Sequence, residues 1–369
     1  MNDINNISWV EIDLSAVQHN TKYYLETVGV PLMAVVKANA FGCGAIEVGK
    51  SALAAGASWL AVARYCEAHA LREANITAPI LVFGAVTPEE VDQAIHENVT
   101  LSIYDFEAAR MYAQRAQNCR SKISVHIKVD TGLGRLGVIY QDAQSLAKFA
   151  VEQKGIAIDG VYSHFAMADV TLNNPMSYLQ LKRFNDVLQA LQEIGISPKW
   201  IHCSNSGAAA YIPEARFNLV RVGAGLIAIK PVDWGTFPPE LQRVISWKTR
   251  LVSSKVIPAG WSIGYGQNYH LQKDEIIGVL AIGYADGFHN MPDNEVLIHG
   301  KRIPVIGNVC CDMCMVKLPD LYPNGTEVVL LGNQEDEWIT IEDLALRWKL
   351  SDGDITSLIS PRNHRLYIN

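Results

Sequence analysis

Residues 31–222 alternate regularly between short apolar runs and segments of helical composition. The apolar runs, each about the length of one buried strand, are 31–37, 58–63, 79–83, 99–104, 123–129, 158–164, 199–203 and 218–222. Helical segments lie between most of them, such as 45–55, 67–74, 88–97 and 178–194. Eight strand-and-helix units in about two hundred residues predict a parallel (β/α)8 barrel of the TIM type.

The fifth apolar run has one polar face. Apolar residues of 123–130 alternate with Ser124, His126, Lys128 and Asp130, and a strand directs alternate side chains to opposite faces. A barrel strand can direct such a polar row into the barrel interior, whereas a central strand of a doubly wound sheet is apolar on both faces. The row therefore favours the barrel.

The pattern of apolar and polar residues changes on both sides of this repeat. Residues 7–12 read as a strand that leads into a helix, and after about residue 240 the chain reads as strands with few helices. These later strands are expected at 244–257, 275–282, 295–309 and 327–331, with one helix at 341–348. We expect a barrel over 8–240 and a β-rich domain over 241–369, with residues 1–12 packing against the latter. Gly300 is expected first in a type II′ hairpin turn.

Bulk composition narrows the function classes. Of the 369 residues, 49% are hydrophobic and 19% charged, which is typical of a globular protein. A net charge of -7 without a basic stripe disfavours nucleic acid as a partner. Neither a secretion signal nor a membrane span is recognisable, so we expect a cytoplasmic protein. Seven cysteines fit reduced thiols, and we interpret Cys310, Cys311 and Cys314 as buried strand residues without a metal.

The first apolar run ends in a lysine, Lys37, before the chain breaks at Gly42 and Gly44. A lysine there either extends its amine to solvent along its apolar stem or is held in place for chemistry. Functional side chains of a barrel lie at the carboxyl ends of its strands, which is where Lys37 is expected. A desolvated lysine amine has a lowered pKa and can act as a nucleophile or base.

A glycine-rich loop after the fifth run offers a competing interpretation. Residues 132–137 fit the pattern G-x-G-x-x-G, and Asp159 lies at a suitable distance for a dinucleotide fingerprint. An NAD-dependent dehydrogenase is therefore an alternative. The polar face of the preceding strand, its place as fifth of eight and Arg135 inside the loop argue against it, because a barrel has no crevice at a switch point of the sheet.

Later runs also end in polar residues. His164 ends the sixth run, Asn205 and Ser206 follow the seventh, and Arg221 closes the eighth. A helix that begins near Ser206 can hold phosphate at its amino terminus. Because the carboxyl ends of parallel barrel strands share one face, these side chains are expected near Lys37.

Four motifs resemble those of bacterial alanine racemases, a fold type III family that uses pyridoxal 5′-phosphate (PLP). They are AVVKANAFGCG at 34–44, KVDTGLGRLG at 128–137, SIGYG at 262–266 and IGYADG at 282–287. The likeness continues to Arg362 and Arg365, so it spans nearly the whole chain. It implies that Lys37 forms a Schiff base with PLP, and that Lys128 matches a lysine often carbamylated to orient Arg135.

The resemblance implies further roles. The cofactor-binding residues that it implies are Lys37, Arg135, His164, Asn205, Ser206, Arg221, Gly223 and Ala224. The substrate-binding residues that it implies are Arg135, Cys311, Tyr284 and Asp312. It also implies a homodimer with shared active sites, in which Lys37 and Tyr265 of the partner subunit are the two bases that interconvert L-alanine and D-alanine. A non-catalytic PLP carrier, the other alternative, would lack the second base and the β-rich domain.

Several positions depart from the family pattern. The family usually has tyrosine at Phe41 and Pro361, histidine at Cys43, arginine at Asn290 and Asn308, and methionine at Cys311. The family uses the phenols at positions 41 and 361 around the phosphate and the inner site, and both are missing here. The implied cofactor chemistry survives these departures, whereas the substrate choice depends on them. A serine racemase or an amino-acid racemase of broad specificity is therefore an alternative to alanine racemisation.

Overall fold

The computed structural model describes residues 6–167, 174–229 and 238–369, which fall into two compact units. One unit comprises Ala16–Ala228 together with residues 238–242. The other comprises residues 6–15, Ile229 and residues 243–369. No helix in the described parts of the chain is long and apolar enough to cross a membrane.

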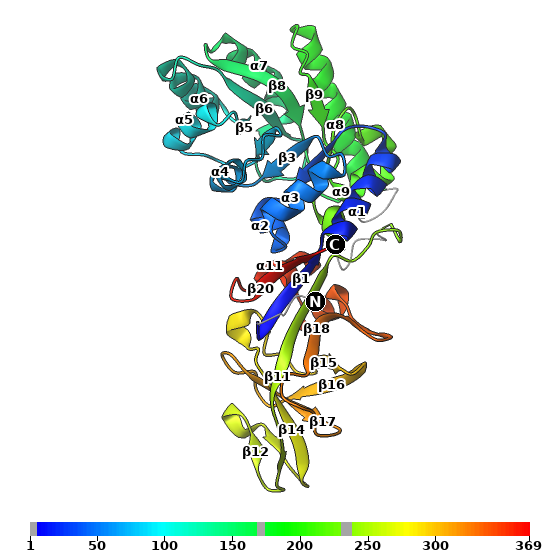
Figure 1. Cartoon of the computed structure of the whole chain (residues 1–369). Helices are drawn as coiled ribbons and strands as arrows, with labels where there is room; N and C mark the ends of the chain where they lie inside the picture. Colours follow the sequence, from blue (N-terminus) through cyan, green and yellow to red (C-terminus); the bar gives the residue numbers. More distant parts are fainter. Residues whose placement is uncertain (1–5, 168–173, 230–237) are drawn as a thin grey trace. The chain divides into compact units, whose positions relative to one another are not determined.

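The first unit contains a ring of eight parallel strands (Figure 1). In spatial order these are β10 (Val220–Val222), β2 (Leu32–Val35), β3 (Trp59–Val62), β4 (Ile80–Val82), β5 (Thr100–Ile103), β6 (Ile123–Asp130), β8 (Ile156–Tyr162) and β9 (Trp200–His202). Two backbone bonds connect the segments of β9 and β10, from Asn218 N to Ile201 O at 3.4 Å and from Arg221 N to Ser204 O, just after β9, at 3.2 Å. Every apolar run of the predicted repeat forms one of these strands, so the barrel prediction is confirmed.

Helices follow the strands around this ring. Their bounds are α1 (Leu14–Val28), α2 (Lys37–Phe41), α3 (Ala45–Ala54), α4 (Tyr65–Glu73), α5 (Pro88–His96), α6 (Phe106–Asn118), α7 (Ala143–Glu152), α8 (Pro175–Glu193) and α9 (Ser206–Tyr211). Helices α5, α6, α7 and α8 lie next to one another on the outside of the strands (Figure 1). Local signals set their starts, since Asp105 accepts Ala108 N at 2.7 Å and caps α6.

The interior of the barrel divides into an apolar and a polar part. A buried cluster of Met33, Trp59, Leu81 and Leu219 lies at or before the middle of the strands. The expected polar row on β6 includes His126, which is fully buried in the middle of the strand, and continues to the buried Lys128 toward the carboxyl end. Because the apolar part is filled, chemistry is confined to the carboxyl ends of the strands.

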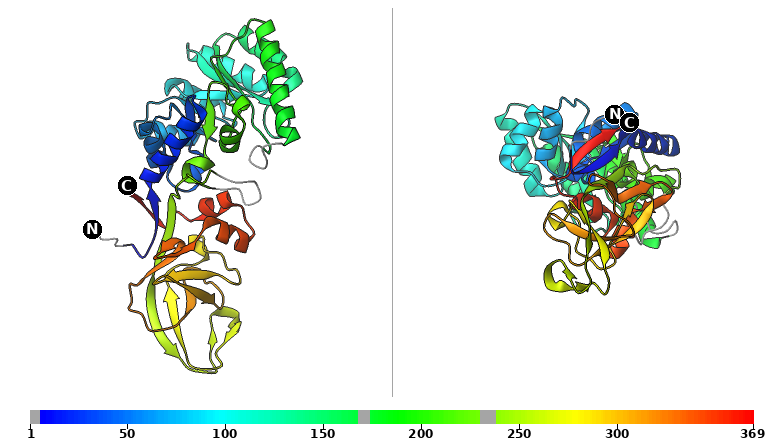
Figure 2. Two further views of the ribbon diagram at one scale, coloured as in Figure 1. Left: turned by 90° about the vertical axis from the view of Figure 1, so that its right-hand side faces the viewer. Right: turned by 60° about the horizontal axis from the view of Figure 1, so that its bottom comes forward.

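The described part of the second unit contains a nine-stranded sheet, a separate two-stranded sheet and two α-helices. Its spatial order is β19 (Glu337–Ile339), β18 (Glu327–Gln334), β15 (Glu295–Ile298), β16 (Lys301–Ile306), β17 (Cys314–Leu318), β14 (Glu275–Leu280), β11 (Ile245–Ile257), β1 (Ser8–Asp13) and β20 (His364–Ile368). A further pairing joins β18 to β11 and curls the sheet. Figure 2 shows β1 (dark blue) beside β20 (red), with which it pairs in parallel. The β-rich second part of the chain is thus as expected.

The hairpin between β15 and β16 differs from the sequence prediction. Ile298 pairs with Lys301, so the turn consists of His299 and Gly300. Both have positive φ, 49° and 63°, which is the requirement of a type I′ turn. The predicted type II′ turn, with Gly300 first, placed the register one residue too late and is wrong.

Two other local predictions for the second unit need correction. Besides α10 (Ile341–Trp348), the unit contains α11 (Asp352–Leu358), whose start is capped by Ser351. Its few apolar residues gave no helical period to recognise. Of the three clustered cysteines, only Cys314 is a buried strand residue, whereas Cys311 is exposed in the preceding loop. All seven cysteines are free thiols, as expected.

A candidate active site at the carboxyl ends of the barrel strands

Lys37 begins a turn of unusual backbone conformation after β2. The next four residues, Ala38 to Phe41, all have positive φ between 52° and 55°. For a residue with a β-carbon this left-handed conformation costs about 1–2 kcal/mol, so neighbouring bonds must hold it. Two of them come from Asn39, whose carbonyl oxygen accepts Gly44 N at 2.8 Å and whose side chain accepts Ala45 N at 2.9 Å. Strain maintained in this way is typical of functional sites.

The amine of Lys37 lies in partly buried surroundings, with Nζ 5.9 Å from the centre of the Phe41 ring. Burial lowers the pKa of Lys37, and the positive charge of Arg135 lowers it further, while Glu67 opposes both. A lowered pKa makes the neutral, reactive amine more available. The structure therefore brings the Lys37 amine near Arg135, which the resemblance implies as a cofactor-binding residue.

Arg221 connects the ends of three strands. Its Nη1 donates to His202 Nδ1 at 2.9 Å, and its Nη2 donates to His164 Nδ1 at 3.1 Å. Nη2 also donates to the carbonyl oxygens of Ser163 at 2.8 Å and Cys203 at 3.1 Å. Burial lowers the pKa of Arg221 to about 10, so it remains a cation at neutral pH.

These contacts determine the tautomers of two buried histidines, His126 and His202, and of the half-buried His164. Because arginine has only donors, Nδ1 of His202 accepts, and its Nε2 must carry the proton that is donated to His126 Nδ1 at 2.9 Å. His126 then carries its proton on Nε2, which has no partner among the described groups. By the same reasoning His164 accepts from Arg221 and keeps a proton on Nε2. Burial and Arg221 lower the pKa of all three imidazoles, that of His126 to about 3, so they are neutral.

Tyr162 on β8 is a site residue that the sequence did not reveal. Its ring stacks on His202 at 4.8 Å, and the cations of Lys128 and Arg221 lie 5.2 and 5.4 Å from its centre. Its hydroxyl donates to Ser102 Oγ at 2.7 Å, since that Oγ donates to Val82 O. Burial raises the pKa of Tyr162 to about 12. The sequence did contain one signal for Tyr162: it precedes His164 by two residues, and residues two apart on a strand lie on the same face.

A glycine makes room for this arrangement. Gly160 on β8 lies opposite His126 on β6, and a β-carbon at position 160 would lie 2.6 Å from three atoms of the His126 ring. Because His126 is fully buried and bonded to His202, it cannot move aside freely. Packing at this point therefore requires glycine.

We predict that Gly160→Ala destabilises the protein by about 1–3 kcal/mol, the usual cost of overpacking a core. The measurement is the denaturant midpoint of the variant against wild type. Gly353→Ala is the control, because nothing lies within 4 Å of the β-carbon that it would add. Equal midpoints for Gly160→Ala and wild type would mean that His126 is not held in place.

Lys128 points into the barrel interior, as expected, and its Nζ donates to Val129 O at 3.1 Å. Burial, followed by the charge of Arg221, lowers the pKa of Lys128 to about 7. A large fraction of this amine is neutral at physiological pH. The adjacent Asp130 plays a different part, since its carboxylate accepts the amides of Gly132, Leu133 and Arg135 and holds the glycine-rich loop.

The glycine-rich loop does not have the geometry of a dinucleotide site. It runs into the short strand β7 (Val138–Ile139), which pairs with β6, and not directly into a helix. Asp159 lies in the middle of β8, where the register with β6 shifts. A dinucleotide fingerprint needs a helix that begins at the loop, so the dehydrogenase alternative loses its structural basis.

The ends of β9 and β10 form a cradle of small residues. Asn205 caps α9 by accepting Ala208 N at 2.9 Å. Ser206 Oγ accepts the amides of Gly223 and Gly225, each at 3.2 Å, and Ala224 begins the next turn. A hydroxyl that accepts twice still has one hydrogen to donate. The resemblance implied Asn205, Ser206, Gly223 and Ala224 as cofactor-binding residues, and the structure brings these four residues together.

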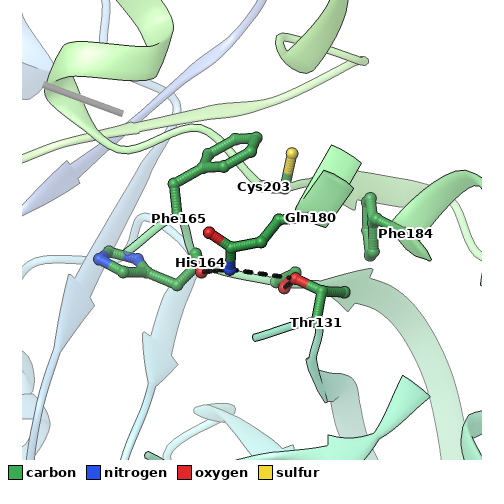
Figure 3. A pocket seen from close by; sticks show the side chains of 7 residues that line it. Thr131, His164, Phe165, Gln180, Phe184 and Cys203 are labelled. Carbon is green, nitrogen blue, oxygen red and sulfur yellow. Dashed lines mark hydrogen bonds between the residues drawn. The ribbon is translucent and has the colours of Figure 1, made fainter. Parts of the chain in front are cut away.

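His164 is braced from behind by α8. Gln180 Nε2 donates to His164 O at 3.1 Å and to Thr131 Oγ1 at 3.4 Å (Figure 3). These residues line a small pocket with Phe165 and Phe184, and Figure 3 shows the His164 imidazole directed away from Thr131. The brace fixes the backbone of His164 while its ring remains at the strand ends.

The remaining candidates lie in the second unit. Tyr265 is 77% exposed in a turn between β12 (Ser262–Ile263) and β13 (Tyr269–His270), and its carbonyl accepts Asn308 Nδ2 at 2.9 Å. Tyr284 is 59% exposed, and a side-chain hydrogen bond with Cys311 raises its pKa. Asp312 is exposed beside Cys311 in the sequence, so Tyr284, Cys311 and Asp312 form one exposed group. Separately, the side chain of Asn290 accepts Val309 N at 2.9 Å.

The structure also describes the surroundings of two residues that depart from the family pattern, Phe41 and Pro361. Phe41 lies at the Lys37 turn, and its ring would be 3.3 Å from a β-carbon at Gly223. Pro361 is exposed in the loop between α11 and β20, where Arg365 donates to the carbonyl oxygens of Ile359 and Ser360. The two positions thus lie in different units.

Two family models cover almost the whole chain: "Alanine racemase, N-terminal domain" matches residues 12–231, and "Alanine racemase, C-terminal domain" matches residues 244–367. An alanine racemase of Halalkalibacterium halodurans is 39% identical over 371 residues, 98% of this chain and 95% of that protein. A crystal structure of an alanine racemase from Bacillus anthracis with bound L-Ala-P has a TM-score of 0.93 at 34% identity, covering 99% and 96% of the two chains. A histidine racemase from Leuconostoc mesenteroides has a TM-score of 0.92 at 29% identity, covering 100% of each chain.

Proposed function

The chain belongs to the alanine racemase family, and we propose that it interconverts L-alanine and D-alanine with PLP bound through Lys37. The observation that carries this proposal is the partly buried amine of Lys37 on a strained turn at the end of a barrel strand, with a lowered pKa. The test is a racemisation assay on purified protein with and without added PLP. Absence of alanine racemisation under both conditions would contradict the proposal.

The residues at the strand ends fit an anionic, phosphate-bearing cofactor. After burial, the charge of Arg135 contributes to lowering the pKa of Lys37, and Arg221 does the same for Lys128. The oxygens of Asp130 are occupied by backbone amides, so this group of cations gains from an added anion. The Ser206 hydroxyl has a hydrogen left for a phosphate oxygen, and Asn205, Gly223 and Ala224 surround it.

PLP, when bound, acts as an electron sink that makes the proton on the substrate Cα removable. Arg221 would face the pyridine nitrogen, and because a guanidinium does not give up its proton, the nitrogen would stay unprotonated. His164, neutral and held by Arg221, would lie against the ring. Arg135 would orient the cofactor and substrate, and the neutral fraction of Lys128 is the form that could be carbamylated.

Two bases on opposite faces of Cα are needed to invert it. We assign the proton on the D face to Lys37 and the proton on the L face to Tyr265 of the partner subunit. Exposure of Tyr265 and Tyr284 on the β-rich unit is consistent with a role in a second copy's site, together with Cys311 and Asp312. The proposal therefore includes a homodimer, a PLP-binding barrel over 8–240 and a β-rich domain over 241–369. A PLP carrier would need neither the second base nor this domain.

We predict that L-serine is accepted within about tenfold of L-alanine, because the wall residues Cys311 and Pro361 are smaller than those usual in the family, and each missing methylene-sized contact changes discrimination by about 1–3 kcal/mol. Asn290 and Asn308, which replace two arginines, act in the same direction. The similar histidine racemase supports a fold that serves more than one side chain. The measurement is kcat/KM for both substrates. A preference for alanine above about a hundredfold, near 2.7 kcal/mol, would leave ordinary specificity.

A further inference from the structure

The residue after Lys37 is bonded to a side chain from the next strand-and-helix unit. Ala38 N donates to Oε1 of Glu67, which lies in the first turn of α4. The second oxygen, Oε2, accepts Ala63 N at 2.9 Å and Arg64 N at 3.0 Å. One carboxylate therefore joins the turn after β2 to the loop after β3.

Helix capping explains only part of this arrangement. A glutamate at the third position of a helix often bonds back to the amide before the helix, as Glu67 does with Arg64. Glu90 has the same position in α5, where its Oε2 accepts Thr87 N at 2.8 Å. The bond to Ala38 has no counterpart in this capping pattern, so it asks for a separate explanation.

The bond to Ala38 acts directly on the backbone of Lys37. The amide that donates it belongs to the planar peptide unit joining Lys37 to Ala38, so Glu67 fixes the orientation of that plane. The turn that follows is left-handed over four residues with β-carbons, and such a turn keeps its shape only where its surroundings hold it. Glu67 also places a negative charge beside the Lys37 amine, opposing burial and Arg135, which lower its pKa.

We propose that Glu67 is a positioning residue for Lys37, holding the turn that directs its amine and supplying negative charge beside it. This inference rests on the proposed function, in which Lys37 binds the cofactor and exchanges the proton on the D face. Glu67 acts through Lys37 and through the peptide that follows it. Its loss should therefore affect one of the two proton transfers more than the other.

The test compares Glu67→Gln with Glu90→Gln in the full-length holoenzyme. Both variants weaken a helix cap, but only the first alters the Lys37 turn. We expect Glu67→Gln to lower kcat by about tenfold, the effect of one charge-assisted hydrogen bond. Glu90→Gln should keep kcat within about twofold of wild type, with a similar loss of melting temperature in both variants.

Two readouts separate positioning from a loss of stability. With α-deuterated substrates, Glu67→Gln should raise the primary isotope effect for D-alanine and lower that for L-alanine, because the proton transfer at Lys37 becomes more rate-limiting in both directions. In the cofactor-free chain, the pH midpoint for labelling of Lys37 by an amine-acylating reagent should fall in Glu67→Gln and stay constant in Glu90→Gln.

The outcomes distinguish this inference from the proposed function. If both glutamine variants agree in kcat, isotope effects and labelling midpoint, Glu67 is a helix cap only and the inference is wrong. If borohydride fixes PLP to another lysine in the wild-type protein, the proposed function fails instead. The labelling midpoint still reports the effect of Glu67 on the Lys37 amine in that case.

Discussion

Replacing Lys37 by alanine is expected to abolish racemisation and to leave PLP unattached to the chain. Lys37 has two proposed roles, as the amine that holds the cofactor and as the base on the D face. Loss of a positioned base alone costs between about a hundredfold and ten-thousandfold, so we expect kcat to fall by at least about a thousandfold. The variant should fold normally, because the side chain ends in a partly exposed site and its β-carbon is retained.

Peptide mapping after borohydride reduction checks this result. In wild type the pyridoxyl adduct should lie on Lys37, and in the variant no adduct should form. Lys50→Ala is a suitable control, because Lys50 is an exposed lysine on the nearby helix α3 and should not affect activity. An adduct on another lysine of wild type, or full activity of Lys37→Ala, would contradict the assignment.

Mixing two inactive variants is expected to restore activity. Lys37→Ala and Tyr265→Ala each remove one proposed base, and Lys37 lies in the barrel unit while Tyr265 lies in the β-rich unit. If each site combines Lys37 of one copy with Tyr265 of the partner subunit, a mixed dimer has one intact site. Random re-association makes half of the dimers mixed, so the mixture should reach about a quarter of wild-type activity.

The experiment needs each variant alone as a control, taken through the same dissociation and re-association. Tyr265→Ala should leave each chain folded, because its side chain is 77% exposed within the single chain and its removal leaves no cavity there. When the proportion of Lys37→Ala to Tyr265→Ala subunits is varied, activity should be highest for equal amounts and fall as either variant is in excess. A folded monomer that racemises at the full wild-type rate would contradict the proposal that each active site is shared between two subunits.

Most of the barrel could be predicted because its signals are local. The strand runs were recognisable as apolar segments of strand length, and the polar alternation of 123–130 anticipated the buried row on β6. The turn type at Gly300 and the existence of α11 were harder to predict. The hairpin register depends on which residues pair across the turn, and α11 has too few apolar residues to produce a helical period.

The candidate site divides in the same way. Lys37, His164, Ser206 and Arg221 could be selected in advance, because the carboxyl ends of parallel strands meet on one face. Tyr162 and Glu67 were missed, since each looks like an ordinary member of its own element. Tyr162 matters through its stacking on His202, and Glu67 through a bond to the turn of the preceding strand-and-helix unit.

The sequence by itself determined the order of strands and helices, the family and the residues at each strand end, because periodicity and motif spacing are properties of neighbouring residues. Only the tertiary structure decided which histidine nitrogens carry protons, that Lys128 has a pKa of about 7 and that Glu67 meets the Lys37 turn. These properties depend on burial and on contacts between residues that are distant in the sequence. Glu67 and Ala38 are 29 positions apart, and His126 and His202 are 76 positions apart. A pattern along the chain does not contain the direction of a side chain or its distance from a charge.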